Sequence, residues 1–152
     1  MKLQKKFKLT LFAGLGLMMG ALGFADGGDG SGDDALTAAA HPVFTAEQAE
    51  AGEVVYQQSC AACHFGQLQG DDFAAALAGG NFRNYWSSRT LEQFLDYVRT
   101  QMPLGQPGTL SDEAYAQVVA YILDFNGYPA GEVELSADPA ELSHIVFGLP
   151  TE

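Results

Sequence analysis

Cys60-Ala61-Ala62-Cys63-His64 is the stretch of this chain that decides its fold. The two cysteines are three positions apart, close to one turn of a helix, so both thiols can reach one flat macrocycle. There they can form thioether bonds with the two vinyl groups of a haem. His64 follows directly, so its imidazole can point back at the iron. Because C-x-x-C-H is the attachment motif of c-type haem, we predict one covalently bound haem with its iron.

Two other readings of the motif are a redox C-x-x-C pair and half of a zinc site. A zinc site needs further cysteines or suitably spaced histidines. The chain has two cysteines in all, and its other histidines, His41 and His144, are far away in the sequence. The sequence therefore favours haem attachment.

Met102 is the predicted second axial ligand of the iron. It is the only methionine after residue 25, and it lies 38 residues beyond His64. Pro103 follows it and stiffens the loop, which helps to hold a thioether on the iron. Methionine and histidine together form a known haem ligand set that raises the reduction potential. The alternatives are a core methionine that fills a gap, or ligation by His41 or His144, which we expect to be ordinary surface or packed residues.

Three capping signals predict three helices. Thr45 and Thr90 each precede a glutamine by three residues, the pattern of a capping box, and Ser111 precedes two acidic residues. Strand signals are absent. The segment between the first two helices, rich in glycine and alanine, is expected to form loops and one short helix. The predicted helices cover residues 45–58, 90–100 and 111–126.

Gly52 lies inside the first predicted helix, where glycine costs about 1 kcal/mol relative to alanine. We expect another helix to cross closely at this point, with Tyr121 or Ile122 as its partner. A tolerated surface glycine is the alternative.

Residues 1–25 resemble an export signal. Four lysines between residues 2 and 8 form a basic region, and residues 9–22 are uncharged and mostly apolar. Small residues end at Ala25, where we expect cleavage. The apolar stretch is short for a membrane span, which needs about 20 residues, although a retained anchor is the alternative. Export predicts a location in the bacterial periplasm, where haem is attached to reduced thiols.

Removal of residues 1–25 leaves three arginines against 19 acidic residues, a formal charge of −16. This charge excludes nucleic acid and anionic membrane surfaces as partners. The negative charge suggests a redox partner with a basic docking patch. Alternatively, it only keeps the protein soluble.

The mature chain divides into three expected parts. Residues 26–42, rich in glycine and aspartate, resemble a flexible acidic tether. Residues 43–127 form the predicted haem domain. Residues 128–152 form an extension with apolar side chains, which either covers the domain or docks a partner.

The order Gly52-x-x-Val55-Tyr56-x-x-x-Cys60-x-x-Cys63-His64, then Met102-Pro103, then a helix that ends at Asn126-Gly127, resembles the class I cytochromes c. The resemblance implies a small all-α fold around one haem, with crossing terminal helices and His64/Met102 ligation. Residues 77–86, 98–103 and 126–131 are similar to the cytochrome domains attached to quinoprotein alcohol dehydrogenases.

The resemblance implies a one-electron carrier, and not an enzyme by itself, that links a dehydrogenase donor to an oxidase or another cytochrome. The alternatives are a haem-based sensor with a labile sixth site and a permanent subunit of a dehydrogenase complex.

Other candidate residues surround the predicted site. Trp86 is expected to hydrogen-bond a haem propionate or to fill the core. Arg83 and Arg99 can offset the propionate charges, and Arg99 can instead pair with a nearby carboxylate. Three tyrosines are expected to pack on the macrocycle or between helices without chemical roles: Tyr97, Tyr115 and Tyr121.

Overall fold

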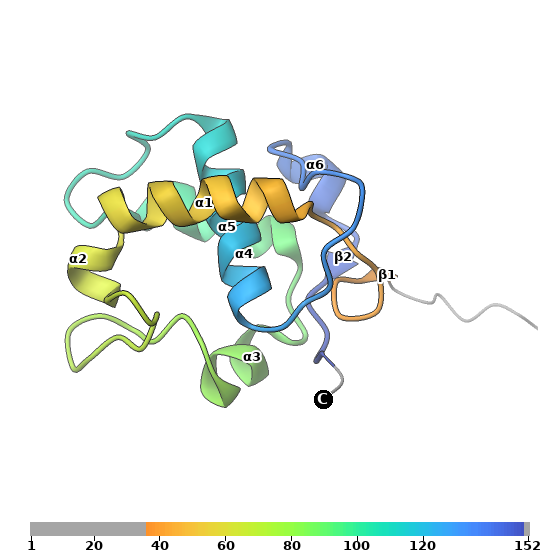
Figure 1. Ribbon diagram of the computed structural model, residues 1–152, viewed down its shortest axis with the longest axis horizontal. Helices are drawn as coiled ribbons and strands as arrows, with labels where there is room; N and C mark the ends of the chain where they lie inside the picture. Colours follow the sequence, from red (N-terminus) through yellow and green to blue (C-terminus); the bar gives the residue numbers. More distant parts are fainter. Residues whose placement is uncertain (1–35, 151–152) are drawn as a thin grey trace, which may run out of the picture. The chain divides into compact units, whose positions relative to one another are not determined.

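The computed structural model describes residues 36–150. The predicted export signal and the first part of the predicted tether lie outside the described residues. Within residues 36–150, no helix is both long enough and apolar enough to cross a membrane. The elements in chain order are β1 (Leu36–Thr37), α1 (Ala46–Ser59), α2 (Ala61–His64), α3 (Gly80–Trp86), α4 (Leu91–Gln101), α5 (Asp112–Phe125), α6 (Pro139–Leu142) and β2 (Ile145–Val146) (Figure 1).

The three long helices begin at the caps that the sequence predicts. The side chains of Thr45 and Ser111 each accept a hydrogen bond of 3.1 Å from the amide three residues on. Thr90 and Gln93 complete a reciprocal capping box, with bonds of 3.1 and 3.2 Å. Each cap satisfies amide groups that have no partner within the helix. The predicted starts are confirmed, and the ends agree within about a residue.

α1 and α5 cross at Gly52. A Cβ atom added there would lie 1.9 Å from the carbonyl oxygen of Gln117 and 3.0 Å from the Cβ of Tyr121. The absence of a side chain therefore lets the backbones of the two helices approach (Figure 1). The prediction of a close crossing with Tyr121 is confirmed.

The segment between α1 and α4 contains two short helices, α2 and α3, where the sequence predicts one. Residues 65–79 connect them as an irregular loop. The buried side chain of Asn126 fixes the end of this loop: its Nδ2 donates to the carbonyl oxygen of Leu77 at 2.9 Å, and its Oδ1 accepts from the amide of Gly79 at 3.1 Å. Asn126, predicted as a helix stop, thus also ties the loop to the end of α5.

Two short strands correct the expectation that strands are absent. β1 pairs with β2 in parallel, with Leu36 opposite Ile145 and Thr37 opposite Val146. Ala38, directly after β1, is fully buried. Residues 36–38 therefore belong to the folded unit, so the described part of residues 26–42 differs from a free tether. A two-residue strand shows no alternation that a sequence pattern could reveal.

The described part of the C-terminal extension packs on the domain. Leu135, Leu142 and Phe147 are buried in the same core as the helices. The Gln48 side chain donates to the Leu135 carbonyl oxygen at 2.9 Å and accepts from its amide at 2.7 Å. Gln48 was predicted to complete a capping box with Thr45, but its side chain instead holds the extension. This packing favours the expectation that the extension covers the domain.

Candidate cofactor site

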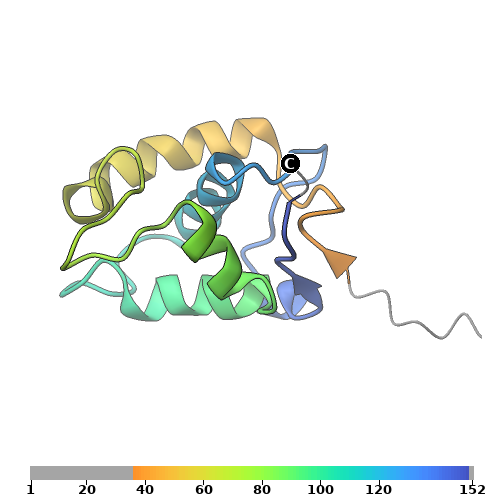
Figure 2. The ribbon, with the colours of Figure 1, turned by 90° about the horizontal axis from the view of Figure 1, so that it is seen from below.

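A cavity of about 860 Å³ contains the predicted haem residues. Cys60, Cys63 and His64 line it from the end of α1 and from α2, and Met102 lines it from the end of α4. Figure 2 shows α1 and α2 along one edge of the molecule and α4 along the other. The remaining walls are largely apolar and include Leu77, Phe94, Val98, Val118 and Ile122.

The backbone brings both cysteines and the histidine to one wall. Cys60 ends α1, and its carbonyl oxygen accepts hydrogen bonds from the amides of Cys63 at 3.1 Å and His64 at 3.0 Å. This single turn of helix gives the C-x-x-C-H motif its compact form. The two cysteines form no disulfide with each other, and Cys63 is more exposed than Cys60. The sequence prediction that these side chains share one site agrees with this placement.

His64 is held in a defined orientation. Its side chain is nearly buried, and its Nδ1 lies 2.8 Å from the carbonyl oxygen of Ala75. A carbonyl oxygen can only accept a hydrogen bond, so Nδ1 carries the proton of the neutral ring. The lone pair of the imidazole then remains on Nε2, the atom that can bind a metal ion. The Ala75 carbonyl was not found from the sequence, because a backbone acceptor leaves no residue-specific signal.

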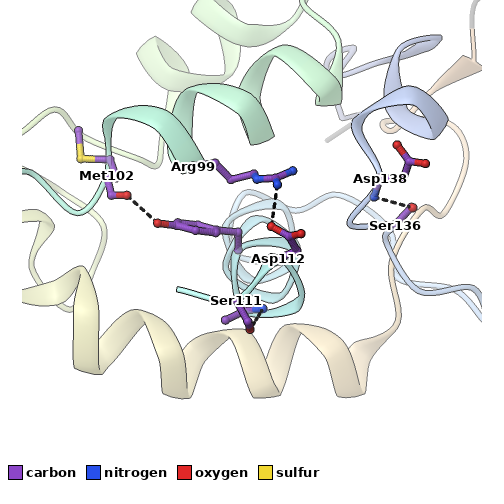
Figure 3. Close-up of polar contacts among 8 residues, drawn as sticks. Arg99, Met102, Ser111, Asp112, Ser136 and Asp138 are labelled. Carbon is purple, nitrogen blue, oxygen red and sulfur yellow. Dashed lines mark hydrogen bonds and ion pairs between the residues drawn. The ribbon is translucent and has the colours of Figure 1, made fainter. Parts of the chain in front are cut away.

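Hydrogen bonds hold both the amide and the carbonyl group of Met102. Its amide donates to the carbonyl oxygen of Val98 at 3.0 Å and closes the last turn of α4. Its carbonyl oxygen accepts a 2.9 Å hydrogen bond from the hydroxyl of Tyr115 on α5 (Figure 3). Pro103 follows and also lines the cavity. Tyr115 was predicted only to pack, and the structure adds this positioning contact.

A second tyrosine secures the loop that follows the motif. The buried Tyr56 donates a 2.7 Å hydrogen bond from its hydroxyl to the carbonyl oxygen of Phe65. Burial raises the pKa of Tyr56 far above its ordinary value, with smaller contributions from Cys60 and Tyr121. The hydroxyl therefore stays protonated and remains a donor across the physiological pH range.

Trp86 and Arg83 are not among the residues that line the cavity. Trp86 lies behind the cavity wall, with its ring centroid 4.6 Å from that of Phe94 and 5.9 Å from that of Phe147. The guanidinium nitrogen Nη2 of Arg99 lies 2.6 Å from the carboxylate oxygen Oδ1 of Asp112 (Figure 3). Pairing with a carboxylate is the alternative that the sequence left open for Arg99. The described structure thus places Trp86 in an aromatic cluster and leaves a propionate contact without support.

The remaining histidines do not reach the cavity. His41 and His144 are both exposed, and neither lines it. Within residues 36–150, no group of three or more His, Cys, Asp or Glu side chains is placed to hold a metal ion by itself. Zinc coordination by the C-x-x-C pair therefore finds no further ligands in the described part of the chain.

The donor set and the cavity fit a haem. Two thiols, one imidazole nitrogen and one thioether face a largely apolar space, and a volume of this size accommodates a ligand as large as a macrocycle. Asp71 is the one carboxylate that lines the cavity. The backbone amides of Phe73 and Ala74 donate to it and lower the pKa of its carboxyl group, so it keeps a negative charge there.

Residues 47–122, half of the 152-residue chain, match the model of a protein family described as "Cytochrome C oxidase, cbb3-type, subunit III". No curated protein matches the chain. Among solved structures, a chain of the sulfane dehydrogenase SoxCD from Paracoccus pantotrophus is similar, with 20% sequence identity and a TM-score of 0.45. The alignment covers 72% of this chain and 62% of that one, so this chain spans about three fifths of the solved chain's length.

Proposed function

Because this chain belongs to the family of monohaem class I cytochromes c and carries a covalently bound haem c, we propose that it is a one-electron carrier with His64 and Met102 as the axial ligands. The observation that carries this proposal is that both side chains, from separate helices, line the cavity that contains Cys60 and Cys63. When bound, the haem iron supplies reversible one-electron chemistry.

The residues around the cavity have distinct roles in the proposal. Cys60 and Cys63 would anchor the haem through thioether bonds. His64 offers Nε2 as a ligand because the Ala75 carbonyl oxygen holds its Nδ1 proton. The apolar walls exclude water and so help to set the reduction potential. A fixed environment suits electron transfer, since little has to rearrange when the charge changes.

Met102 decides between a carrier and a sensor. The Tyr115 hydroxyl and the last turn of α4 hold the backbone of Met102 at the cavity. A thioether held at this position would bind the iron opposite His64 and would leave no place for an external ligand. Electron transfer therefore follows as the function, and catalysis does not. A labile sixth site, as a haem-based sensor would need, is the outcome that the experiment below can reveal.

Location and partners extend the proposal. Export of the chain, with cleavage after Ala25, would place the protein in the periplasm. A dehydrogenase is the proposed donor, and an oxidase or another cytochrome the proposed acceptor. The acidic character of the chain and Asp71 at the cavity favour a partner with a basic docking face there. A free shuttle and a subunit of a dehydrogenase complex both agree with this arrangement.

The experiment is an absorption spectrum of the periplasmically expressed protein in both redox states, with and without carbon monoxide. The proposal expects a low-spin c-type spectrum that carbon monoxide does not change, and a weak sulfur-to-iron band in the oxidised protein. A Met102→Ala variant, which opens the sixth site, provides the comparison and should bind carbon monoxide. If the unmodified protein binds it equally well, the sensor reading replaces the carrier.

A further inference from the structure

An aromatic surface near the start of α4 extends from the edge of the cavity to the outside of the domain. It consists of Tyr85, Trp86, Arg89 and Tyr97, which we call the Arg89 patch. Tyr85 is 60% exposed, whereas Trp86 is only partly exposed. Tyr97 is 49% exposed, in part toward the cavity that it lines. The ring centroid of Trp86 lies 5.3 Å from that of Tyr85 and 6.1 Å from that of Tyr97. A folded chain gains little from leaving the ring of Tyr85 in water next to a second aromatic ring and an arginine, so the exposure of Tyr85 is the feature to explain.

Arg89 adds a positive charge to these rings. Its guanidinium carbon lies 3.8 Å from the ring centroid of Tyr85 and 5.4 Å from that of Trp86, and it donates a hydrogen bond to the Tyr85 carbonyl oxygen. Cation–π contacts of this kind hold the guanidinium over the aromatic rings. The remaining N–H donors of the guanidinium are left for other acceptors.

No carboxylate in the described part of the chain neutralises Arg89. The one ion pair within residues 36–150 joins Arg99 to Asp112. Glu92 and Asp96 lie on α4, which begins two residues after Arg89, but neither forms an ion pair with Arg89. In a chain with 19 acidic residues and three arginines, an arginine that stacks on tyrosine instead of pairing with a carboxylate is available to an acidic partner.

The segment that carries Arg89 is held in place. The amide of Phe147 donates to the Arg89 carbonyl oxygen at 3.0 Å, and the amide of Gly148 donates to the Ser87 carbonyl oxygen at 2.9 Å. The C-terminal extension thus fixes this segment beside β2, which Figure 1 shows next to the start of α4. A surface that is already ordered loses little conformational entropy when a partner binds.

The Arg89 patch also connects to the cavity. Tyr97 and Phe94 line the cavity, and the Trp86 ring packs on Phe94 at a centroid distance of 4.6 Å. The rings of Trp86 and Phe94 therefore separate a molecule bound over Tyr85 and Trp86 from the cavity. Arg89 precedes α4, whereas Met102 follows it, and 11 helical residues span about 16 Å. Arg89 thus lies about a helix length away from the predicted axial methionine.

We propose that the Arg89 patch is a second docking surface, which takes the acidic face of a one-electron partner protein. Tyrosine, tryptophan and arginine are the residues that interfaces concentrate at their energetic centres. Charge complementarity selects the partner, because Arg89 attracts carboxylates while the acidic remainder of the surface attracts basic partners. With two surfaces of opposite preference, donor and acceptor can bind at the same time. The inference rests on the proposed carrier function for its meaning.

The test maps the binding of an anion to the reduced, haem-containing protein by NMR. Hexacyanochromate(III) is a trivalent anion, inert to electron transfer, whose paramagnetism broadens amide signals nearby. We expect it to broaden the signals of residues 85–89 and of Tyr97 selectively at low ionic strength. An Arg89→Gln variant should weaken this broadening by about threefold, the size of one exposed charge contact. Arg89→Lys, which keeps the charge, should retain more of it than Arg89→Gln.

The matched control is Arg99→Gln, which changes the net charge equally but removes an arginine already paired with Asp112. It should leave the broadening at residues 85–89 almost unchanged. Broadening that avoids the Arg89 patch, or that both glutamine variants reduce equally, would overturn the proposal. The map tests only where the anion binds, whereas the carbon monoxide experiment tests only the sixth ligand of the iron. Either proposal can therefore be overturned without the other.

Discussion

The hydroxyl of Tyr115 on α5 donates a 2.9 Å hydrogen bond to the carbonyl oxygen of Met102 at the end of α4 (Figure 3). Tyr115 is buried, so this bond forms away from bulk water. It links the helix that crosses α1 to the loop that carries the predicted axial ligand. The position of Met102 therefore depends on the packing of α5 as well as on its own helix.

A Tyr115→Phe variant should loosen Met102. The loss of one hydrogen bond is expected to cost about 1 kcal/mol of stability and to let carbon monoxide compete measurably for the reduced iron. Tyr97→Phe is the matched control, because Tyr97, like Met102, lines the cavity, but its hydroxyl makes no hydrogen bond within residues 36–150. Carbon monoxide titration of both variants checks the prediction, and equal behaviour of the two would contradict it.

Gln48→Ala should detach the C-terminal extension from α1. The substitution leaves the buried amide and carbonyl groups of Leu135 without the partner that they share, so we expect a loss of about 2 to 4 kcal/mol of unfolding free energy. Gln57→Ala on the exposed part of the same helix should change it little. Denaturant titration followed at the haem band measures both. Equal unfolding free energies of the two variants would mean that the extension contributes nothing to stability, and would contradict the prediction.

Gly52→Ala should force α1 and α5 apart. The added Cβ would lie 1.9 Å from the Gln117 carbonyl oxygen, a backbone atom that can move only with its helix. We expect a destabilisation of about 3 kcal/mol, at the upper end of typical overpacking costs. Gly80→Ala is the control: its Cβ meets nothing within 4 Å, so stability should stay the same or rise slightly. Thermal unfolding that ranks the two variants in the opposite order would refute the close crossing.

The protein should lose stability in strong alkali partly through Tyr128. Burial raises the pKa of Tyr128 from 10.0 to about 12, although Arg83 acts in the opposite direction. The folded state retains the Tyr128 proton more tightly than the unfolded state. The stability that protonated Tyr128 contributes is therefore complete below pH 10.0 and declines as the pH rises toward 12. In Tyr128→Phe, the decline between these pH values should be smaller. Unfolding free energies measured across this range check the prediction, and identical slopes would contradict it.

The sequence predicts those features that short-range chemistry determines. Thr45, Thr90 and Ser111 cap their helices as expected, since a cap depends on residues three positions apart. Gly52 indicates a crossing because an interior glycine needs a packing reason. The C-x-x-C-H motif predicts the shared placement of Cys60, Cys63 and His64 because one turn of helix determines it.

Long-range relationships are not predictable from these patterns. Gln48 fits a local capping box as well as a distant partner, and only the folded chain brings Leu135 to its side chain. The parallel pairing of β1 with β2 joins segments from opposite ends of the described chain, each two residues long. Ala75 contributes a carbonyl oxygen that every residue type possesses. Trp86 is large enough either to contact a haem or to fill the core, and only the folded structure shows which residues surround its ring.

The measurement that tests the central claim most directly is the NMR signal of the Met102 methyl group in the reduced protein. If the chain is cleaved after Ala25, Met102 is its only methionine, so selective methyl labelling gives one signal. A methyl group bound through its sulfur to the haem iron lies over the macrocycle, whose ring current must shift its signal far upfield of that of free methionine. We predict this shift. A Met102 methyl signal at its ordinary position would contradict axial ligation and with it the carrier function.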